Sequence, residues 1–243
     1  MFDEINGQII SEILFGESFR VIREKKNWVY GINLIDNYKG WIKKIYLSSL
    51  PNFTHVISVI RSLIIEKPDI KSKPINYLPL GSLVLVSEIT NNWAKIILSK
   101  KHDYGYGYIS SLHFVKKNDN FKDWLIFAEK FLGVPYKWGG RDSIAIDCSA
   151  LLQLSYSFSG VMLPRDSKDQ LDFFKKSPVH SVKTNKNKAM NFKRGDIIFW
   201  KGHVGIMIDF KRIIHASGYH GSVVIENFED ADKRINSSYT LVT

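Results

Sequence analysis

The first half of the chain alternates short runs of β-branched and aromatic residues with turn residues. Three such runs cover residues 19–22, 28–32 and 40–42, and Gly16-Glu17 and Asp36-Asn37 provide turn chemistry around them. Side chains of this kind suit the strands of a pleated sheet. The pattern predicts an all-β beginning to the chain.

A second series of strand-like runs follows the same layout at residues 80–86, 92–97 and 107–109. Each series passes from a glycine turn through a strand to a strand with a tryptophan, and closes on a glycine next to an aromatic residue. We interpret this repetition as two small β-barrels, with domain 1 over residues 1–51 and domain 2 over residues 52–117.

The hydrophobic period changes to that of helices after residue 117. Three helices are predicted: one over residues 121–132, one from residue 147 to just before residue 160, and one that starts with the capping box of residues 167–170. Asp119 or Asn120 can cap the first helix, and Gly133 is expected to end it.

Strand-like runs return near the end of the chain. They cover residues 196–200, 203–208, 212–215 and 223–225, after a Lys- and Asn-rich stretch at 181–193 that favours neither helix nor strand. Helices followed by antiparallel strands indicate an α+β domain over residues 118–243.

Cys148 is the single cysteine of the chain, and its position suggests chemistry. It follows the expected cap Asp147, so it lies in the first turn of a helix, where free N–H groups stabilise a thiolate. The turn at residues 136–140 ends on Gly139-Gly140, which lets backbone approach a ligand closely. The ordinary alternative for such a cysteine is a small buried apolar residue.

A base for this thiol has to come from another element. His203 opens one strand-like run and His215 closes the next, so pairing of these strands through a turn near residues 209–211 would bring the two imidazoles together. His203 could then accept the thiol proton while His215 orients its ring. Two histidines on a hairpin could also be surface residues or metal ligands. No carboxylate cluster lies at ligand spacing, so we expect no metal.

Six ordered motifs give this part of the chain a resemblance to a known family. They are Tyr136-x-Trp138-Gly139-Gly140, Asp147-Cys148-Ser149, Leu163-Pro164-Arg165-Asp166-Ser167-x-x-Gln170, Gly195-Asp196-x-x-Phe199-Trp200, His203-Val204-Gly205 and Ile214-His215-Ala216. In order and spacing they resemble the papain-like NlpC-type cysteine peptidases over roughly residues 121–228. Ala150 stands where that family usually has glycine.

The β-repeat at the start resembles the bacterial SH3 domain. The stretches Phe15-Gly16-Glu17 and Tyr38-Lys39-Gly40-Trp41 match that pattern, and the second copy is more divergent. The combined resemblance implies a fold class: a papain-like α+β catalytic domain preceded by two small all-β SH3-like barrels.

The resemblance also implies a reaction. Cys148 would be the nucleophile, His203 the base and His215 the residue that orients it, with the backbone N–H of Cys148 and the hydroxyl of Tyr136 stabilising the oxyanion. The bond cut in this family joins γ-D-glutamate to a diamino acid such as meso-diaminopimelate. No cofactor is expected.

Family members with two bacterial SH3 domains resemble the chain in particular, and they recognise a free N-terminal L-alanine. The matching substrate-binding positions are Glu17, Tyr38, Trp138, Asp147, Ser149, Asp166 and Ser167. Glu17 and Tyr38 could equally be ordinary turn and barrel-surface residues. Asp166 and Ser167 could serve only as loop and cap residues.

Charge and composition add limits to this picture. Lys and Arg outnumber Asp and Glu by 34 to 24, for a formal net charge of +10, which favours anionic partners such as muropeptides. No basic block tracks a nucleic-acid groove, no apolar run of roughly 18 residues could span a membrane, and one cysteine allows no internal disulfide. The start of the chain lacks a secretory pattern, so we expect a cytoplasmic location.

The expected substrates are therefore peptidoglycan-derived peptides, cut during recycling or turnover. Two other functions stay open. The chain could be an exported endopeptidase or amidase that trims intact wall, or a non-catalytic module that binds wall peptides.

Overall fold

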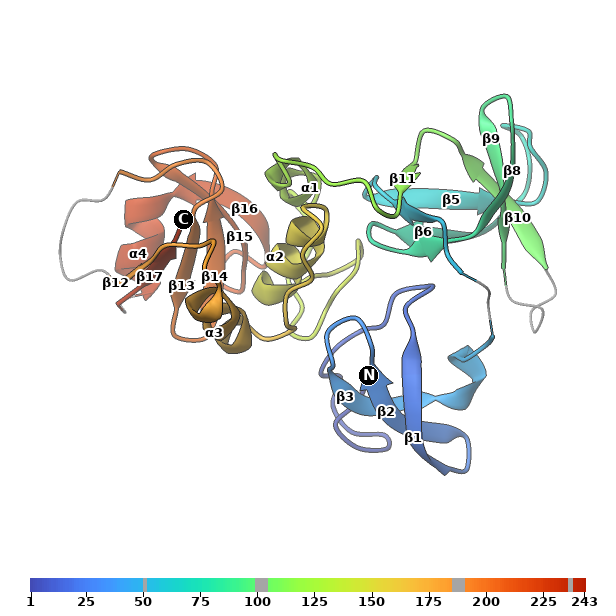
Figure 1. Cartoon of the computed structure of the whole chain (residues 1–243), viewed down its shortest axis with the longest axis horizontal. Coiled ribbons are helices and arrows are strands. Elements are labelled where there is room, and N and C mark those ends of the chain that lie inside the picture. The colour runs from blue at the N-terminus through green and yellow to red at the C-terminus, as the bar shows by residue number, and fades with distance from the viewer. Residues whose placement is uncertain (50–51, 99–104, 185–190, 236–237) are drawn as a thin grey trace. The chain divides into compact units, whose positions relative to one another are not determined.

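The computed structural model describes residues 1–49, 52–98, 105–184, 191–235 and 238–243. It divides into two compact units, Met1–Asp119 and Asn120–Thr243, which contain the blue-to-green and the green-to-red elements of Figure 1. The domain boundary expected after residue 117 lies two residues from this division. The boundary expected after residue 51 falls on residues 50–51, which are outside the described residues.

Strands are the main regular elements described in the first unit. They are β1 Phe19–Lys25, β2 Trp28–Asn33, β3 Lys39–Lys43, β4 His55–Ile57, β5 Arg61–Ile65, β6 Pro74–Pro79, β7 Leu83–Val84, β8 Val86–Thr90, β9 Trp93–Ile97, β10 Tyr106–Ser110 and β11 Phe114–Lys116, with a single 3-10 turn, η1 Lys44–Tyr46. They form three sheets, in the orders β1-β2-β3, β6-β5-β10-β9-β8 and β11-β4-β7. The strand-like runs at 19–22, 28–32, 40–42, 92–97 and 107–109 all lie on observed strands.

Two separate apolar cores hold this unit together. One forms around Met1, Val29 and Ile42, and the other includes Ile57 and Ile96 among its buried side chains. Phe15, which comes before β1 in the chain, packs against the second of these cores. The sequence pattern missed β4, β5, β6 and β11, because these strands are short or mix polar and apolar residues without strict alternation.

The second unit is built on one antiparallel sheet with helices around it. Its elements are α1 Leu125–Glu129, α2 Cys148–Ser157, α3 Ser167–Lys176, β12 Val182–Thr184, β13 Ile197–Trp200, β14 His203–Met207, β15 Arg212–Ser217, β16 Ser222–Asn227, α4 Phe228–Ile235 and β17 Thr240–Val242. The strands form one sheet in the order β12-β17-β13-β14-β15-β16.

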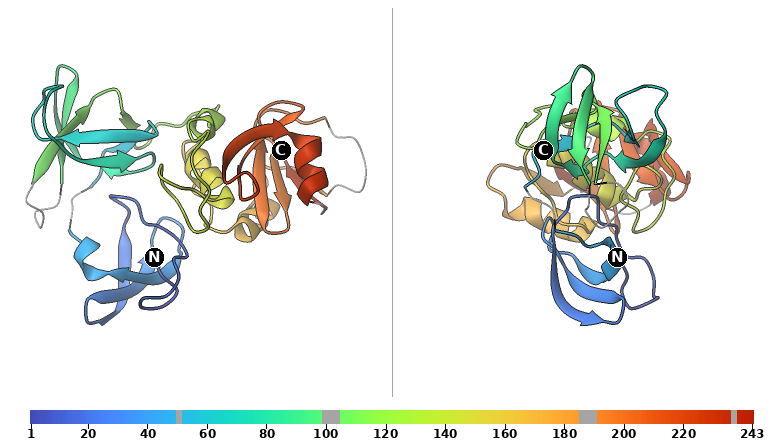
Figure 2. Two further views of the ribbon diagram at one scale, coloured as in Figure 1. Left: turned by 180° about the vertical axis from the view of Figure 1, so that it is seen from behind. Right: turned by 90° about the vertical axis from the view of Figure 1, so that its right-hand side faces the viewer.

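Both faces of this sheet are covered by helices. Helix α2 lies against β14 and β15, and α4 lies on the opposite face (Figure 2). Phe228 and Ala231 of α4 pack in one apolar core with Ile198 and Ile213. All four residues of β13 are buried, which fits a strand with neighbours on both sides. Helix α2 is buried from Cys148 to Tyr156, so it forms the centre of the unit.

Several expectations for this unit need correction. Helix α1 covers only Leu125–Glu129, because Trp124 and Lys130 are its caps and tight turns continue to Gly133. The capping box at 167–170 does not form: Asp166 is the cap of α3, and the Gln170 amide turns inward to the carbonyl oxygens of Ser149 and Pro164, both at 2.9 Å.

The stretch at 181–193 also contains structure that its composition did not predict. Residues Val182–Thr184 form β12, which pairs with β17, and residues 185–190 lie outside the described residues. Helix α4 and strand β17 were not predicted either. Among the described residues, no helix is both long and apolar enough to cross a membrane.

We expect the centre of α2 to control the stability of the second unit. Leu152 is fully buried, so Leu152→Ala should lower the free energy of unfolding by about 2–5 kcal/mol through lost burial and a residual cavity. Hydrogen exchange at the α2 amides measures this change. The control is Leu132→Ala, at a side chain that is 55% exposed, which should cost no more than about 0.5 kcal/mol. Equal effects of the two substitutions would contradict the central role of α2.

Candidate active site

Cys148 is the first residue of α2, and the residue before it caps the helix. Asp147 has extended backbone, and its carboxylate accepts a hydrogen bond of 2.8 Å from the N–H of Ala150. This is the geometry of an ordinary N-cap. The thiol therefore lies in the first turn, where the N–H groups have no partner within the helix.

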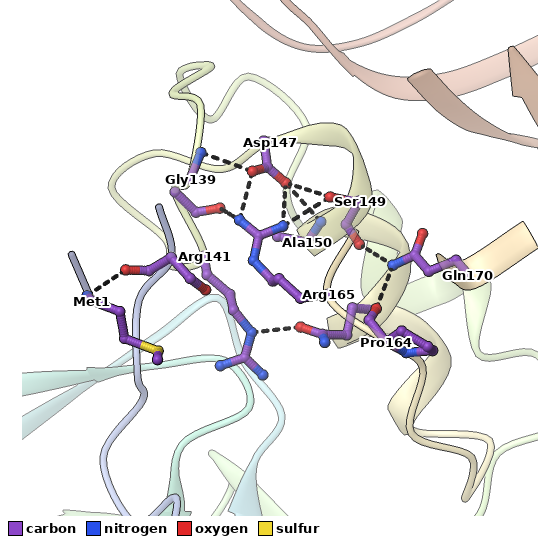
Figure 3. Close-up of polar contacts among 12 residues, drawn as sticks. Met1, Gly139, Arg141, Asp147, Ser149, Ala150, Pro164, Arg165 and Gln170 are labelled. Atoms are coloured by element: carbon purple, nitrogen blue, oxygen red, sulfur yellow. Dashed lines mark hydrogen bonds and ion pairs between the residues drawn. The ribbon is translucent and has the colours of Figure 1, made fainter. Parts of the chain in front are cut away.

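A buried ion pair holds this helix start in place. The guanidinium of Arg165 donates two parallel hydrogen bonds to Asp147, Nη2 to Oδ2 at 2.6 Å and Nη1 to Oδ1 at 2.9 Å (Figure 3). The two side chains are only 1% and 7% exposed. Nη1 also donates to the hydroxyl of Ser149 at 2.8 Å. Because the pair is bidentate and desolvated, neither charge could stay buried without the other.

The glycine turn before Cys148 is part of the same network. The N–H of Gly139 donates to Asp147 Oδ2 at 2.9 Å, and a Cβ on Gly140 would lie 2.6 Å from the carbonyl oxygen of Ala145. Glycine is thus required at position 140 because the backbone of residue 145 passes close to it, and not because a ligand does. The turn, the cap and the loop before α3 form one rigid support for the thiol.

Burial dominates the electrostatics of the thiol. It raises the pKa of Cys148 to about 12, and the Asp147 carboxylate adds to the increase. Hydrogen bonds from the backbone N–H groups of Val204 and Ser149, together with the charge of Arg165, act in the opposite direction. The neutral thiol is therefore favoured in the free protein. The N–H groups of Val204 and Ser149 can stabilise a thiolate when it forms.

The two predicted histidines are joined directly. Strands β14 and β15 pair in antiparallel register, and His203 Nε2 lies 2.7 Å from His215 Nδ1. Burial, then the neighbouring His215 and Arg234, lower the pKa of His203 to about 3. Burial also lowers the pKa of His215. Both rings are therefore neutral near pH 7, which is the form of an imidazole that accepts a proton.

The line of polar groups continues beyond His215. His215 Nε2 lies 2.7 Å from Glu226 Oε1, and the same oxygen accepts from Arg234 Nη2 and lies 3.4 Å from His220 Nε2. Burial opposes the charge of Glu226, but the hydrogen bonds from Arg234 and His215 outweigh it and keep its pKa below the ordinary value. Among the described residues, no group of three or more His, Cys, Asp or Glu forms a metal-ion site.

The other site residues expected in this unit lie at different depths. The Tyr136 hydroxyl is half-buried, and burial, then Cys148 and Asp147, raise its pKa to about 12, so it keeps its proton and can donate. Trp138 is 61% exposed. Asp166 is exposed and Ser167 half-buried at the start of α3, whereas Ser149 and Asp147 lie inside the Arg165 network.

Glu17 and Tyr38 belong to the first unit, where both have structural contacts. Glu17 Oε2 accepts hydrogen bonds from the N–H of Leu14 at 3.1 Å and from Asn33 Nδ2 at 3.0 Å. Tyr38 packs against the core around Val29. These contacts fit the structural roles in a turn and on the barrel that the sequence left open for Glu17 and Tyr38. The substrate-binding role of the two residues stays a prediction.

Three residues of the network were given no role from the sequence. Arg165 lies in a recognised motif, but its partner is 18 positions away. Glu226 and Arg234 lie in no motif. Glu226 directly follows the strand-like run at 223–225, but its partner depends on strand register, which the sequence pattern does not give.

Comparisons with known proteins identify the family that this unit matches. Residues 133–237 match the model of the NlpC/P60 family. The chain is 25% identical to dipeptidyl-peptidase 6 of Lysinibacillus sphaericus, with 88% of this chain and 82% of that protein covered. It is 26% identical to the gamma-D-glutamyl-L-lysine dipeptidyl-peptidase of Bacillus subtilis (strain 168), with 86% and 72% covered.

A solved structure shows the same fold. The crystal structure of an NlpC/P60 family protein from Bacillus cereus superposes with a TM-score of 0.77 at 20% identity and covers 95% of this chain and 80% of that one. The family match identifies the second unit as a cysteine peptidase domain. It is an NlpC/P60 domain, and through it the chain is a hydrolase.

We expect the buried pair under the thiol to be far more important for stability than an exposed one. Arg165→Met leaves the Asp147 carboxylate buried without its partner, so the free energy of unfolding should fall by about 3–5 kcal/mol. The control is Arg212→Met, which breaks a 2.7 Å pair with Asp209 in which the arginine is 59% exposed and should cost at most about 1 kcal/mol.

Urea denaturation measures the free energy of unfolding of both variants, and hydrogen exchange at the α2 amides locates the change. If Arg165→Met cost no more than Arg212→Met, the ion pair would not be the support of the helix start.

Proposed function

We propose that the chain hydrolyses the γ-D-glutamyl–diamino acid bond of cell-wall peptides that carry a free N-terminal L-alanine. The observation that supports this most directly is the thiol of Cys148 at the start of α2, beside β14 and the hydrogen-bonded pair His203–His215. The names of two relatives that match most of the chain, a dipeptidyl-peptidase and a gamma-D-glutamyl-L-lysine dipeptidyl-peptidase, point to the same substrate class.

The proposed reaction is acyl transfer to sulfur. His203 accepts the proton of Cys148 as the sulfur attacks the carbonyl carbon, and it returns that proton to the departing amine. The backbone N–H of Cys148 and the hydroxyl of Tyr136 donate to the oxyanion. Water then attacks the thioester and gives its proton to His203. The C–S bond breaks to release the dipeptide, and His203 returns the proton to the sulfur of Cys148.

The preference for a free amine rests on carboxylates near the helix starts. Arg165 already neutralises Asp147 at 2.6 Å, so Asp147 acts in this scheme by holding Ser149 and the turn. Asp166, exposed directly before α3, is the acid of this unit that we assign to the attraction of an ammonium group. In the first unit, Glu17 and Tyr38 keep their proposed part in substrate recognition.

The two β cores of the first unit support the interpretation as two SH3-like barrels. A requirement for a free alanine amine selects peptides already released from glycan. We therefore propose recycling or turnover in the cytoplasm, where the +10 charge favours encounters with anionic muropeptides.

The central test uses L-Ala-γ-D-Glu-meso-diaminopimelate, the corresponding L-lysine peptide and the N-acetylated form of each. We expect mass spectrometry to show release of L-Ala-D-Glu from the free peptides only. Cys148→Ala should lower kcat on the order of 10⁶-fold, because the nucleophile is gone. Equal cleavage of free and acetylated peptides would exclude amine recognition, and no cleavage of any peptide would exclude the proposed peptidase.

The role of Asp166 can be separated from the chemistry. Asp166→Asn removes one exposed charge, so KM for the free tripeptide should rise about fivefold while kcat stays within about twofold. The matched control is Asp172→Asn, an exposed acid on the same helix that pairs with Lys175 and should leave KM unchanged. A KM for Asp166→Asn equal to that of the control would contradict this role.

A further inference from the structure

Glu226 lies on the same face of the sheet as His215. In the β15–β16 register His215 is opposite Val224, and Glu226 follows two residues later, so its side chain projects to the same side. The carboxylate reaches diagonally to the ring, with Oε1 at 2.7 Å from Nε2. Glu226 is half-buried, at 14% side-chain exposure, and Arg234 of α4 holds it from the other side.

The proton positions of both rings follow from this contact. Glu226 is ionised and can only accept a hydrogen bond, so His215 must have its proton on Nε2. Because His215 is neutral, its Nδ1 is then a bare acceptor. His203 Nε2, 2.7 Å away, must donate to it and has the proton of that ring. The one ring nitrogen of His203 left to accept a proton is Nδ1.

We propose that Glu226 is a positioning residue that sets the tautomers of His215 and His203, so that His203 presents a bare Nδ1 to the thiol. This inference rests on the roles proposed above for Cys148 and His203. Without Glu226, His215 could place its proton on Nδ1, and His203 would then turn its lone pair toward His215 instead of the thiol.

In the proposed attack step only one proton moves. The thiol proton moves to His203 Nδ1, the electron pair left on sulfur forms the bond to the carbonyl carbon, and no other proton has to move. The positive charge created on His203 is stabilised through His215 by Glu226. Arg234 and His220 are the other charged or titratable groups at this carboxylate, and Arg234 keeps it ionised and oriented.

The test compares the tautomers and the kinetics of Glu226→Ala and Glu226→Gln with the wild type. In protein labelled with ¹⁵N-histidine, long-range ¹H–¹⁵N spectra should show protons on Nε2 of both His203 and His215. In Glu226→Ala these protons should redistribute between the two nitrogens, and kcat should fall about 10²- to 10⁴-fold while KM stays within about twofold.

Glu226→Gln is the conservative variant. Arg234 should hold its amide oxygen where the carboxylate oxygen was, so the tautomers should persist and kcat should fall only about tenfold, from the lost charge. The matched control is Glu229→Gln, an exposed acid at the start of α4, which should equal the wild type in every measurement.

Three results would overturn the proposal. The first is a proton on Nδ1 instead of Nε2 of His203 or His215 in the wild type. The second is wild-type tautomers with kcat within twofold in Glu226→Ala. The third, if that variant does not fold, is an unchanged kcat in Glu226→Gln. The spectra of the wild type need no substrate. Failure of the wild type to cut any peptide would therefore refute the proposed function separately, without deciding where the protons lie.

Discussion

The geometry of the site depends on the ion pair between Arg165 and Asp147. A carboxylate and a guanidinium taken out of water are stable only when they satisfy each other, and here two hydrogen bonds of 2.6 and 2.9 Å do so. The same carboxylate caps α2 and accepts from Gly139, so one desolvated pair joins the turn, the helix start and the loop before α3. Cys148 directly follows this carboxylate, as the first residue of the helix.

A second line of groups crosses the sheet from the thiol's neighbourhood to α4. His203, His215, Glu226 and Arg234 come from four consecutive elements, and each contacts the next. Burial keeps both imidazoles neutral, while the arginine keeps the carboxylate charged. Because the imidazoles are neutral and the carboxylate is charged, each ring has one nitrogen that donates and one that accepts. Proton transfer requires this arrangement.

Much of the local structure was predictable because its causes are local. Asp147 before an apolar helical period predicted α2, and the apolar runs around His203 and His215 predicted β14 and β15. The predictions that failed needed distant partners. The capping box at 167–170 was plausible locally, but Gln170 gains more by satisfying the carbonyl oxygens of Ser149 and Pro164 inside the protein. Strand β12 exists because β17 pairs with it.

The sequence by itself determined the motif order, the class of chemistry and the helix on which Cys148 lies, since caps, periodicity and residue types act over a few positions. Only the tertiary structure decided that Asp147 is neutralised by an arginine 18 positions away and that Glu226 reaches His215. The physical reason is that a buried charge and a strand register are set by whatever packs against them. A change of one residue in the β15–β16 register would turn Glu226 to the other face of the sheet.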